Sequence, residues 1–340
     1  MIDIIYIERA VAEHPRTLEI LRRFPRAQRI YCERYTEIFN RKAQNFRLQK
    51  KRPALILAGK FRQRLLPVPG GYSLGTPHAY YFSHMLNCLY DCRYCFLQGM
   101  FRSAHYVLFV NYEDFATDIE QTIRSHGTGA VQFFSGYDCD SLALDPLTGF
   151  TEFFLPLLAR WPRALLELRT KSTQIRRLIA HGPVSNCVVA FSFTPQPVAV
   201  ALEHKTPSLA RRIEAMARLQ QQGWLIGLRF DPIIHAMNYR ENYARLFNDI
   251  FSAIDPEALH SVTLGSFRLP GDYFNNMLKL YPDEPLFAAA PKNMEGPPAG
   301  RNAMTPCRSD IDSAMLDYCN HLLTTFISRE KIHCCHATLA

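Results

Sequence analysis

Along the chain, short apolar runs alternate with segments in which apolar residues recur every three or four positions. Five runs between residues 130 and 264 have the length and the β-branched or aromatic content of buried strands. The runs are Ala130–Phe134, Ala164–Leu168, Cys187–Phe191, Leu225–Phe230 and Ser261–Leu264. The segments between them predict helices near residues 150–160, 172–180, 207–222 and 239–253. Strands that alternate with helices in this way are typical of parallel sheets.

A further strand leads into a cysteine-containing segment that begins at Cys88, so the pattern comprises six strand–helix units. Crossovers between parallel strands are right-handed, and a series of them therefore rolls into a sheet that curves toward a barrel. A closed eight-fold barrel would need two more units. We therefore predict an α/β fold built on an open, partial (β/α)₆ barrel of the TIM type.

The regions on either side of the barrel have different patterns. The N-terminal region predicts a helix around Glu13–Arg26, a short strand at Pro53–Ala58 and a turn at Gly70–Gly71. The C-terminal region begins with a Pro- and Gly-rich loop and continues with a helix near Asp310–Arg329. We expect a basic N-terminal extension, a barrel and a C-terminal extension, which span residues 1–75, 76–280 and 281–340.

Polar and reactive side chains follow the predicted strands. Parallel barrels carry their chemistry at the carboxyl ends of the strands, so these residues are candidates for a functional site. They are Ser135, Gly136, Asp138, Cys139, Ser141, Arg169, Lys171, Ser192, Thr194, Asp231, Ser266 and Arg268. Arg268 suits either a contact to a phosphate or another group of a substrate or a structural salt bridge, and both interpretations stay open at this point.

Cys88, Cys92 and Cys95 have the spacing Cys-x-x-x-Cys-x-x-Cys. A [4Fe–4S] cluster is usually held by four thiolates, so a group of three leaves one iron free to bind a substrate or cofactor. This is the layout of a radical S-adenosylmethionine (SAM) enzyme. One alternative is a zinc site with His84 as the fourth ligand. The other is three unconnected core cysteines, because free cysteine packs like a small apolar residue.

Length and composition exclude some classes of protein. With 340 residues, of which 48% are hydrophobic, the chain can bury a large core. Ten cysteines are too few for a secreted disulfide scaffold, and the N-terminus lacks a signal-type apolar stretch. No apolar run reaches the roughly 18 residues needed to span a bilayer. We therefore expect a cytoplasmic monomer without membrane segments.

The positive charge of the chain is unevenly distributed. A net charge of +8 and a pI near 9.0 favour an anionic partner. The excess is concentrated in a stretch with Phe46 and Phe61 interleaved among its cations, which are Arg41, Lys42, Arg47, Lys50, Lys51, Arg52, Lys60, Arg62 and Arg64. Such a stretch favours nucleic acid as the partner, and an ordinary solvated basic face is the alternative.

With these residues assembled, the chain resembles the spore photoproduct lyase family, radical SAM enzymes that repair a methylene-bridged thymine dimer in DNA without light. The cysteine motif alone indicates only a radical SAM enzyme, and Cys139 after the second strand narrows the resemblance to this family. The matching segments are Tyr6–Glu8, Leu55–Leu57, Cys92–Gln98, Cys139–Leu142, Arg169–Lys171, Phe191–Ser192, Arg211–Ala215, Asp231–Ile233 and Lys331–Ile332.

The resemblance implies roles for individual residues. The three cysteines of the motif would ligate a [4Fe–4S] cluster, whose open iron takes SAM. A 5′-deoxyadenosyl radical derived from SAM would then abstract hydrogen from the lesion. The ammonium of Lys171 suits the methionyl carboxylate or the ribose oxygens of SAM. The candidate cofactor contacts are Ser141, Lys171, Ser192 and Thr194.

Cys139 matches the cysteine that returns a hydrogen atom to the thymine radical, a task that suits a thiol because its S–H bond is weak. A buried or redox-idle thiol is the alternative. Tyr94 matches one of two tyrosines that are thought to relay hydrogen back to the cofactor in the family. Phe96 stands in place of the other and has no O–H. The relay would therefore run through Tyr94 alone, or SAM would be consumed.

A second departure lies before the last helix, where the family has a hairpin rich in basic and aromatic residues that wedges into duplex DNA. Here Ala288–Arg301 contains two cations, Lys292 and Arg301, and no aromatic residue. Two weaker candidates follow from other segments. His333–His336 is a soft-metal or redox site or an unstructured tail, and Glu203–Lys205 is expected to be a loop.

Motif, charge and resemblance together predict a DNA-repair lyase with a [4Fe–4S] cluster, SAM and a thymine lesion as substrate. A reductant such as flavodoxin or ferredoxin is the expected partner. The unusual hairpin segment leaves a second interpretation open, in which the substrate is another modified nucleotide, RNA or a small molecule. A non-catalytic, metal-bearing nucleic-acid-binding module is the alternative of a different class.

Overall fold

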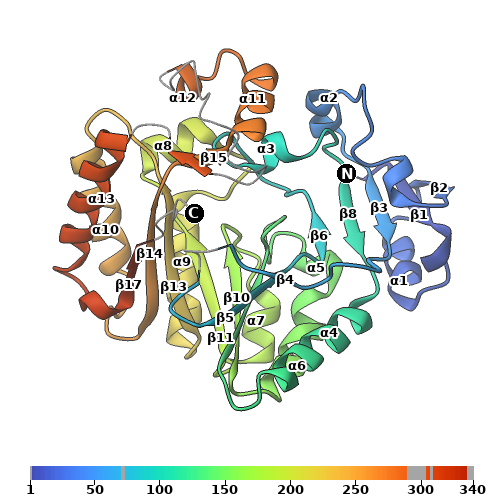
Figure 1. Cartoon of the computed structure of the whole chain (residues 1–340), viewed down its shortest axis with the longest axis horizontal. Coiled ribbons are helices and arrows are strands. Elements are labelled where there is room, and N and C mark those ends of the chain that lie inside the picture. Colours follow the sequence, from blue (N-terminus) through green and yellow to red (C-terminus); the bar gives the residue numbers. More distant parts are fainter. Residues whose placement is uncertain (1, 70–72, 289–303, 307–308, 335–340) are drawn as a thin grey trace.

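The computed structural model describes residues 2–69, 73–288, 304–306 and 309–334. Its larger sheet has eight strands in the order β17-β14-β13-β11-β10-β9-β5-β4 and curves around the centre of the molecule (Figure 1). Neighbouring strands are parallel except for β4 and β5. The strands are β4 (Leu66–Pro67), β5 (His78–Phe82), β9 (Val131–Ser135), β10 (Ala164–Thr170), β11 (Cys187–Ser192), β13 (Leu225–Ile233), β14 (Leu259–Ser266) and β17 (Ile332–Cys334).

The predicted partial barrel is confirmed. From β5 through β9, β10, β11 and β13 to β14, the parallel strands follow one another around the sheet in chain order. Each of the five apolar runs in the sequence overlaps one of these strands. Every residue of β11 is buried, as expected for a parallel strand covered on both faces.

Helices cover the outer face of this sheet (Figure 1). In α9, buried residues recur at helical spacing, with Leu209, Ala215, Met216 and Leu219 turned toward the core. Four of the helices correspond to the helical segments predicted between the strands. In chain order, the helices from residue 112 onward that belong to this part of the molecule, including α5 near its centre and α8 at its upper edge, are α4 (Tyr112–Ser125), α5 (Asp145–Thr148), α6 (Phe150–Ala159), α7 (Arg176–His181), α8 (Gln196–Leu202), α9 (Leu209–Gln221), α10 (Tyr239–Phe251) and α13 (Ser309–Leu323).

A second sheet of five strands lies beside the barrel, in the order β2-β1-β3-β8-β6 (Figure 1). Its first three strands come from the predicted N-terminal extension, and β8 and β6 come from the barrel region. The two regions therefore share one sheet. Its elements are β1 (Ile4–Glu8), η1 (Arg9–Val11), α1 (Pro15–Arg23), β2 (Gln28–Cys32), η2 (Tyr35–Glu37), α2 (Phe46–Lys51), β3 (Leu55–Ala58), β6 (Met85–Leu86) and β8 (Tyr106–Phe109).

Short elements gather at the upper edge of the barrel in the view of Figure 1. Two of them, α3 and α11, pack closely because Gly99 has no side chain. A Cβ at this position would lie 2.2 Å from the backbone oxygen of Tyr273. The elements are β7 (Asp91–Cys92), α3 (Leu97–Met100), β12 (Glu203–His204), β15 (Arg268–Pro270), α11 (Gly271–Leu280), α12 (Pro285–Ala288) and β16 (Met304–Pro306).

The structure changes several expected boundaries. The last long helix, α13, ends at Leu323, and Arg329 begins a separate short 3-10 helix, η3 (Arg329–Lys331). The prediction of a loop at Glu203–Lys205 was wrong, because its first two residues form β12, which pairs antiparallel with β7. Cys334 lies in β17, at the edge of the barrel sheet. The predicted turn at residues 70–71, most of the hairpin segment (289–301) and residues 335–336 lie outside the described residues.

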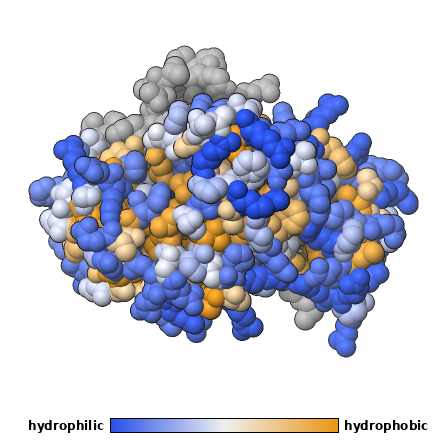
Figure 2. Space-filling model, turned by 90° about the horizontal axis from the view of Figure 1, so that it is seen from below, coloured by the Kyte–Doolittle hydropathy of each residue, from blue (hydrophilic) through white to orange (hydrophobic). Residues whose placement is uncertain are grey.

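The surface has a mixed character. Seen from below, hydrophobic residues gather across the middle of the face and hydrophilic residues surround them (Figure 2). Apolar atoms normally contribute more than half of a folded protein's surface, so this face alone indicates no partner. Among the helices that the structure describes, none combines the length and the apolar character that a membrane crossing requires.

Candidate functional site

A cavity of about 230 Å³ opens at the carboxyl ends of the barrel strands. Its wall combines the segment that carries the three cysteines with residues from the ends of five strands. Nine of the twelve rim residues expected from the sequence line it, which are Ser135, Gly136, Cys139, Arg169, Lys171, Ser192, Asp231, Ser266 and Arg268. The expected gathering of polar residues at one rim is therefore present, whereas Asp138, Ser141 and Thr194 are buried and do not line the cavity.

The cysteine loop, Cys88–Phe96, is held in place at its start and in its middle. Asn87, just before it, has a left-handed backbone conformation (φ 68°), which asparagine tolerates better than most residues. Its side-chain amide donates two hydrogen bonds, of 2.7 and 2.8 Å, to backbone oxygens. Within the loop, β7 pairs with β12. The three cysteines therefore sit on a segment with a defined path.

Lys50 is buried beneath the cysteine loop, although the sequence groups it with a basic surface stretch. Its Nζ donates to the backbone oxygens of Cys88 and Tyr90 at 3.4 and 3.3 Å and lies 3.9 Å from the Asp91 carboxylate. Lys60 of the same stretch is half-buried, and desolvation lowers its pKa. Lys50, one of the nine cations that favour nucleic acid, therefore lies in the interior instead.

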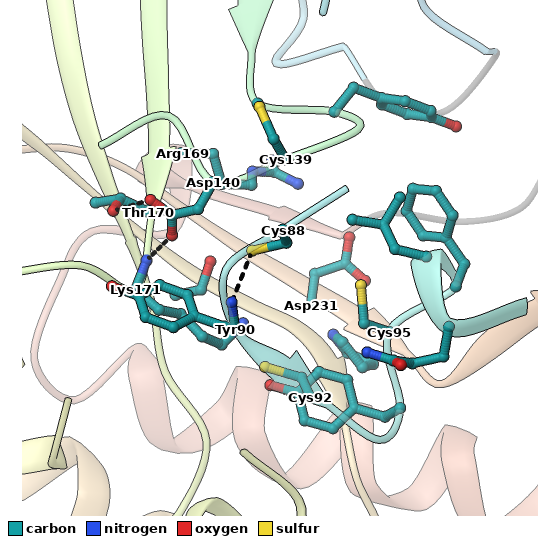
Figure 3. Close-up of a pocket in the computed structure, with 18 of the residues that line it drawn as sticks. Cys88, Tyr90, Cys92, Cys95, Cys139, Asp140, Arg169, Thr170, Lys171 and Asp231 are labelled. Atoms are coloured by element: carbon teal, nitrogen blue, oxygen red, sulfur yellow. Dashed lines mark hydrogen bonds between the residues drawn. The ribbon is translucent and has the colours of Figure 1, made fainter. Parts of the chain in front are cut away.

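The three cysteines line the same cavity (Figure 3). In the part of the chain that the structure describes, no three His, Cys, Asp or Glu side chains converge as ligands of a single metal ion. Each thiolate of a cubane binds a different iron, so its ligands stand apart rather than converge on one point. Burial raises the pKa of all three thiols, that of Cys88 to about 12. The arrangement suits a cluster better than a zinc ion.

His84, the fourth ligand of the alternative zinc site, faces away from this cavity. Its ring stacks on Phe150, with the two centroids 4.0 Å apart, and it is absent from the cavity wall. Burial lowers the pKa of His84 to about 3, so the imidazole is neutral near pH 7. The geometry gives no support to a Cys₃His zinc site.

Asp140 braces the strand ends beside the cysteines. Its Oδ2 accepts a hydrogen bond from the backbone N–H of Lys171 at 2.7 Å, which is drawn in Figure 3, and Oδ1 accepts one from the Thr170 hydroxyl at 2.7 Å. Two more backbone N–H groups, those of Leu142 and Ala143, donate to Oδ1 at 2.9 Å. Burial raises the pKa of Asp140, and these donors oppose the rise. Asp140 thereby fixes Lys171 at the cavity.

Glu203 is fully buried behind Tyr94. Its carboxylate accepts hydrogen bonds from the Tyr94 hydroxyl, from the Thr194 hydroxyl at 2.9 Å and from Nη2 of Arg212 at 2.7 Å. Burial acts to raise the pKa of Glu203, but the cations Lys171 and Arg212 outweigh it and hold the pKa below its ordinary value. An ionised carboxylate therefore positions Tyr94, and Thr194 points at Glu203 rather than into the cavity.

The remaining cofactor candidates differ in exposure to the cavity. Lys171 and Ser192 line it, and the ammonium of Lys171 lies 5.4 Å from the centre of the Tyr94 ring. Ser141 is buried behind the wall, with its Oγ 2.9 Å from Oγ of Ser135. The close contact depends on Gly136, where a Cβ would lie 2.5 Å from the Ser141 Oγ. The roles of these residues toward SAM stay predictions.

Cys139 lines the cavity opposite the cysteine loop and is 6% exposed (Figure 3). Burial raises the pKa of its thiol well above the ordinary value, and the neighbouring Cys88 and Asp138 add to the effect. Cys139 is therefore a protonated thiol in the wall of the cavity that the cluster cysteines also line. Its position agrees with hydrogen donation, which stays a prediction.

Aromatic side chains form another part of the wall. Tyr81 and Tyr137 stack with their ring centroids 4.3 Å apart, and Phe96 packs against Tyr137 at 5.4 Å. All three line the cavity. Flat apolar faces of this kind suit a planar heterocycle.

A protein-family model described as spore photoproduct lyase matches residues 71–277, more than half of the chain. The chain belongs to the spore photoproduct lyase family. The matched region contains the cysteine loop and the six parallel strands of the barrel, so the resemblance drawn from the motifs is confirmed.

Curated relatives of this family member include two spore photoproduct lyases. The one from Bacillus subtilis is 23% identical over 177 residues, which is 52% of this chain and 52% of the relative. The one from Clostridium acetobutylicum is 22% identical over 200 residues, which is 58% and 59%. The alignments thus span a little over half the length of each relative.

Solved structures of spore photoproduct lyase resemble this chain over nearly its whole length. One, a mutant with bound AdoMet and dinucleoside spore photoproduct, has a TM-score of 0.83 and 16% identity and covers 99% of both chains. Another, complexed with dinucleoside spore photoproduct, has a TM-score of 0.81 and 15% identity and covers 99% of this chain and 98% of the other. At such identities the likeness shows a shared fold.

Several residues that hold the site in this spore photoproduct lyase family member were not expected from the sequence, among them Glu203 and Arg212. Glu203 was assigned to a loop, and Arg212 was noted only as part of a matching segment. Arg212 had a usable signal, because it shares the apolar stripe of α9 with Ala215, Met216 and Leu219. An arginine on a buried helix face requires a buried anion, and the glutamate after α8 supplies it.

Proposed function

We propose that this chain is a radical SAM lyase that reverses a methylene-bridged thymine dimer in DNA. The observation that carries the proposal is that Cys88, Cys92, Cys95 and Cys139 line one cavity in a member of the spore photoproduct lyase family. The names of the relatives support the reaction, and the ligands bound in a protein of the same fold support SAM and the lesion as ligands.

The residues present fit a [4Fe–4S] cluster with SAM. The three cysteines offer three separate thiolates, and Lys50 and Lys171 place cations beside them that favour their anionic form. When bound, the cluster and SAM would supply a 5′-deoxyadenosyl radical able to take hydrogen from the lesion.

The protein's own residues would bind SAM and orient it in the cavity. Lys171, fixed by Asp140, would pair with the carboxylate or ribose of SAM, and Ser192 would donate a hydrogen bond from the neighbouring strand end. Ser141 and Thr194 would support this wall from behind through Ser135 and Glu203. The aromatic residues would exclude water from the reacting groups.

Cys139 would complete the reaction by giving the hydrogen atom of its S–H to the thymine radical, leaving a sulfur-centred radical on the protein. Tyr94, whose O–H Glu203 holds in a fixed orientation, would give its hydrogen atom to this sulfur radical. The phenoxyl radical left on Tyr94 would regain a hydrogen atom from 5′-deoxyadenosine, as the family relay implies. Because Phe96 has no such hydrogen, Tyr94 would be the one phenol of the family pair that is retained.

Two partners belong to the proposal. A reductant such as flavodoxin or ferredoxin would deliver the electron that the cluster needs, and lesion-containing DNA would be the substrate. We propose that the chain acts as a monomer.

The test is anaerobic reconstitution followed by incubation with SAM, reductant and synthetic dinucleoside spore photoproduct. We expect 5′-deoxyadenosine and repaired dinucleotide to form. Cys139→Ala should still release 5′-deoxyadenosine and should divert the lesion to side products, because the returning hydrogen is missing.

Cys319→Ala is the matched control, since Cys319 is a free cysteine in α13 that does not line the cavity. It should behave as the unmodified protein does. Release of 5′-deoxyadenosine without any repair, together with activity on another modified nucleotide in a substrate panel, would replace the lyase proposal with the second interpretation. No 5′-deoxyadenosine with any substrate would refute both.

A further inference from the structure

Asp231 and Arg268 form an ion pair in the wall of the cavity. Asp231 lies in β13 and Arg268 begins β15, and both side chains line the cavity. Nη1 of Arg268 is 3.3 Å from Oδ1 of Asp231, and Nη2 is 3.5 Å from Oδ2. Nη1 also donates to the backbone oxygen of Ser266 at 2.7 Å. The end of β14 therefore fixes the Arg268 side chain of the pair.

This pair differs from two fully buried ion pairs, Glu203–Arg212 and Glu167–Arg229. In those, nitrogen and oxygen are 2.7 Å apart and neither side chain is exposed, whereas Asp231 keeps 12% and Arg268 keeps 4% of its side-chain surface. Gly265 makes room for the pair, because a Cβ there would lie 2.4 Å from Oδ1 of Asp231 and 2.7 Å from Nη1 of Arg268. The fold thus presents an anionic acceptor beside a cationic donor at the cavity surface.

We propose that Asp231 and Arg268 recognise the imide edge of a thymine in the lesion. Asp231 accepts a hydrogen bond from N3–H, and Arg268 donates one to the adjacent ring carbonyl. This inference rests on the proposed function and names the groups that would select its substrate. Bases taken out of the stack are typically read through this edge while side chains pack on their faces. Here Phe96 and Tyr137 offer such faces in the same cavity.

The position of the pair favours the lesion over the cofactor. Of the proposed SAM contacts that line the cavity, Lys171 follows β10 and Ser192 ends β11. Asp231 belongs to β13 and Arg268 follows β14, farther along the sheet and next to the C-terminal elements β15 and α11. The chemistry also selects among pyrimidines, because cytosine carries a lone pair at N3, which the carboxylate would repel. The class of substrate is therefore an imide-bearing pyrimidine, such as thymine or uracil.

The experiment compares the affinity of the reconstituted, SAM-loaded protein for dinucleoside spore photoproduct and for the same compound methylated at N3 of its thymines. A methyl group removes the donor that Asp231 would use and places an apolar group against the carboxylate, which keeps only Arg268 as its partner. We expect the methylated compound to bind roughly 10- to 100-fold more weakly. Asp231→Ala should reduce this ratio to less than about 3-fold, and Glu152→Ala, which removes a surface carboxylate, should leave it unchanged.

Several results would overturn the inference. They are equal binding of both compounds, binding of neither, full discrimination by Asp231→Ala, and a loss of SAM affinity in Asp231→Ala with discrimination retained, which would assign the pair to the cofactor. The comparison in the unmodified protein needs no variant, so it decides the matter even if Asp231→Ala fails to fold. Turnover is measured separately, so selective binding without repair would refute the proposed function and leave this inference standing.

Discussion

Glu167 and Arg229 in the barrel wall form the same kind of ion pair as Glu203 and Arg212 beneath the cysteine loop. In each pair the shortest nitrogen–oxygen distance is 2.7 Å, and in each neither side chain is exposed. What differs is the set of elements that each pair joins.

The barrel pair joins strands to strands. Arg229 on β13 donates to both carboxylate oxygens of Glu167 on β10, at 3.0 and 2.7 Å, and to the hydroxyl and backbone oxygen of Ser261 on β14 at 3.0 and 3.2 Å. These contacts reach across β11, which lies between β10 and β13 in the sheet. The pair therefore stabilises the curvature of the barrel.

The loop pair joins the barrel to the chemistry. Glu203 on β12 lies between Arg212 of α9 and the hydroxyl of Tyr94 in the cysteine loop. Arg212 also donates to the backbone oxygen of Ser192, which lines the cavity. Two buried ion pairs of equal geometry therefore have different roles. Glu167–Arg229 stabilises the fold, and Glu203–Arg212 positions residues of the site.

The largest expected effect comes from removing one cation of each pair. Arg229→Met and Arg212→Met each remove the closest cation from a buried carboxylate, so each should lower the free energy of unfolding by about 3–5 kcal/mol. We expect Arg212→Met also to lower the iron bound per folded chain, and Arg229→Met to leave it unchanged. Urea unfolding and iron analysis measure the two effects. Equal iron contents in the two variants would contradict the claim that Glu203–Arg212 alone of the two pairs supports the site.

The contribution of Glu167 to the stability of the protein should depend on pH. Burial acts to raise the pKa of Glu167, but Arg229 and Arg169 outweigh it and hold the pKa at about 2, below its ordinary 4.5. The stabilisation is complete above about pH 4.5 and is lost as the pH falls toward 2. Between pH 5 and pH 3, the unmodified protein should lose about 2 kcal/mol more stability than Glu167→Gln. Parallel stability curves for the two proteins would show that Glu167 has no depressed pKa.

A smaller effect comes from removing one hydroxyl from each network. Tyr94→Phe deletes a donor to Glu203, and Ser261→Ala deletes an acceptor of Arg229. Each should cost about 1.5 kcal/mol of unfolding free energy, because each hydrogen bond involves a charged group. Lesion repair assayed in parallel should slow in Tyr94→Phe alone. Equal repair rates in both variants would remove Tyr94 from the mechanism.

The smallest effect is expected at the surface. Arg160 and Glu120 lie 2.8 Å apart, nearly as close as the buried pairs, but 64% and 23% of their side chains are exposed. Arg160→Ala should therefore change the free energy of unfolding by less than about 0.5 kcal/mol. A loss comparable with that of Arg229→Met would mean that distance rather than burial determines the strength of these pairs.

The sequence predicted the parts of the molecule that have a local signature. The strands of the barrel are short apolar runs, and the cysteine spacing is a motif in itself, so both were found from the chain alone. Glu203 was missed because β12 has two residues and exists only through its pairing with β7, more than 100 positions away. The pattern of hydrophobic positions along the chain does not predict such a long-range contact.

Orientation at the strand ends was also beyond the sequence. Ser192 ends a strand of the barrel and Ser141 follows one, yet Ser192 lines the cavity whereas Ser141 bonds to Ser135 and does not line it. Lys50 shows the same limit, since a lysine in a basic stretch looks exposed until the cysteine loop covers it. Which way a side chain points depends on what packs against it, and that is decided by the fold.

The central claim is that Cys88, Cys92 and Cys95 hold an iron–sulfur cluster, and metal analysis of the anaerobically reconstituted protein tests it most directly. We predict about four irons and four acid-labile sulfides per chain. Cys92→Ser should lose them while keeping its barrel fold by circular dichroism. Colourless protein that holds one zinc per chain, or a Cys92→Ser variant that retains the full iron content, would contradict the account.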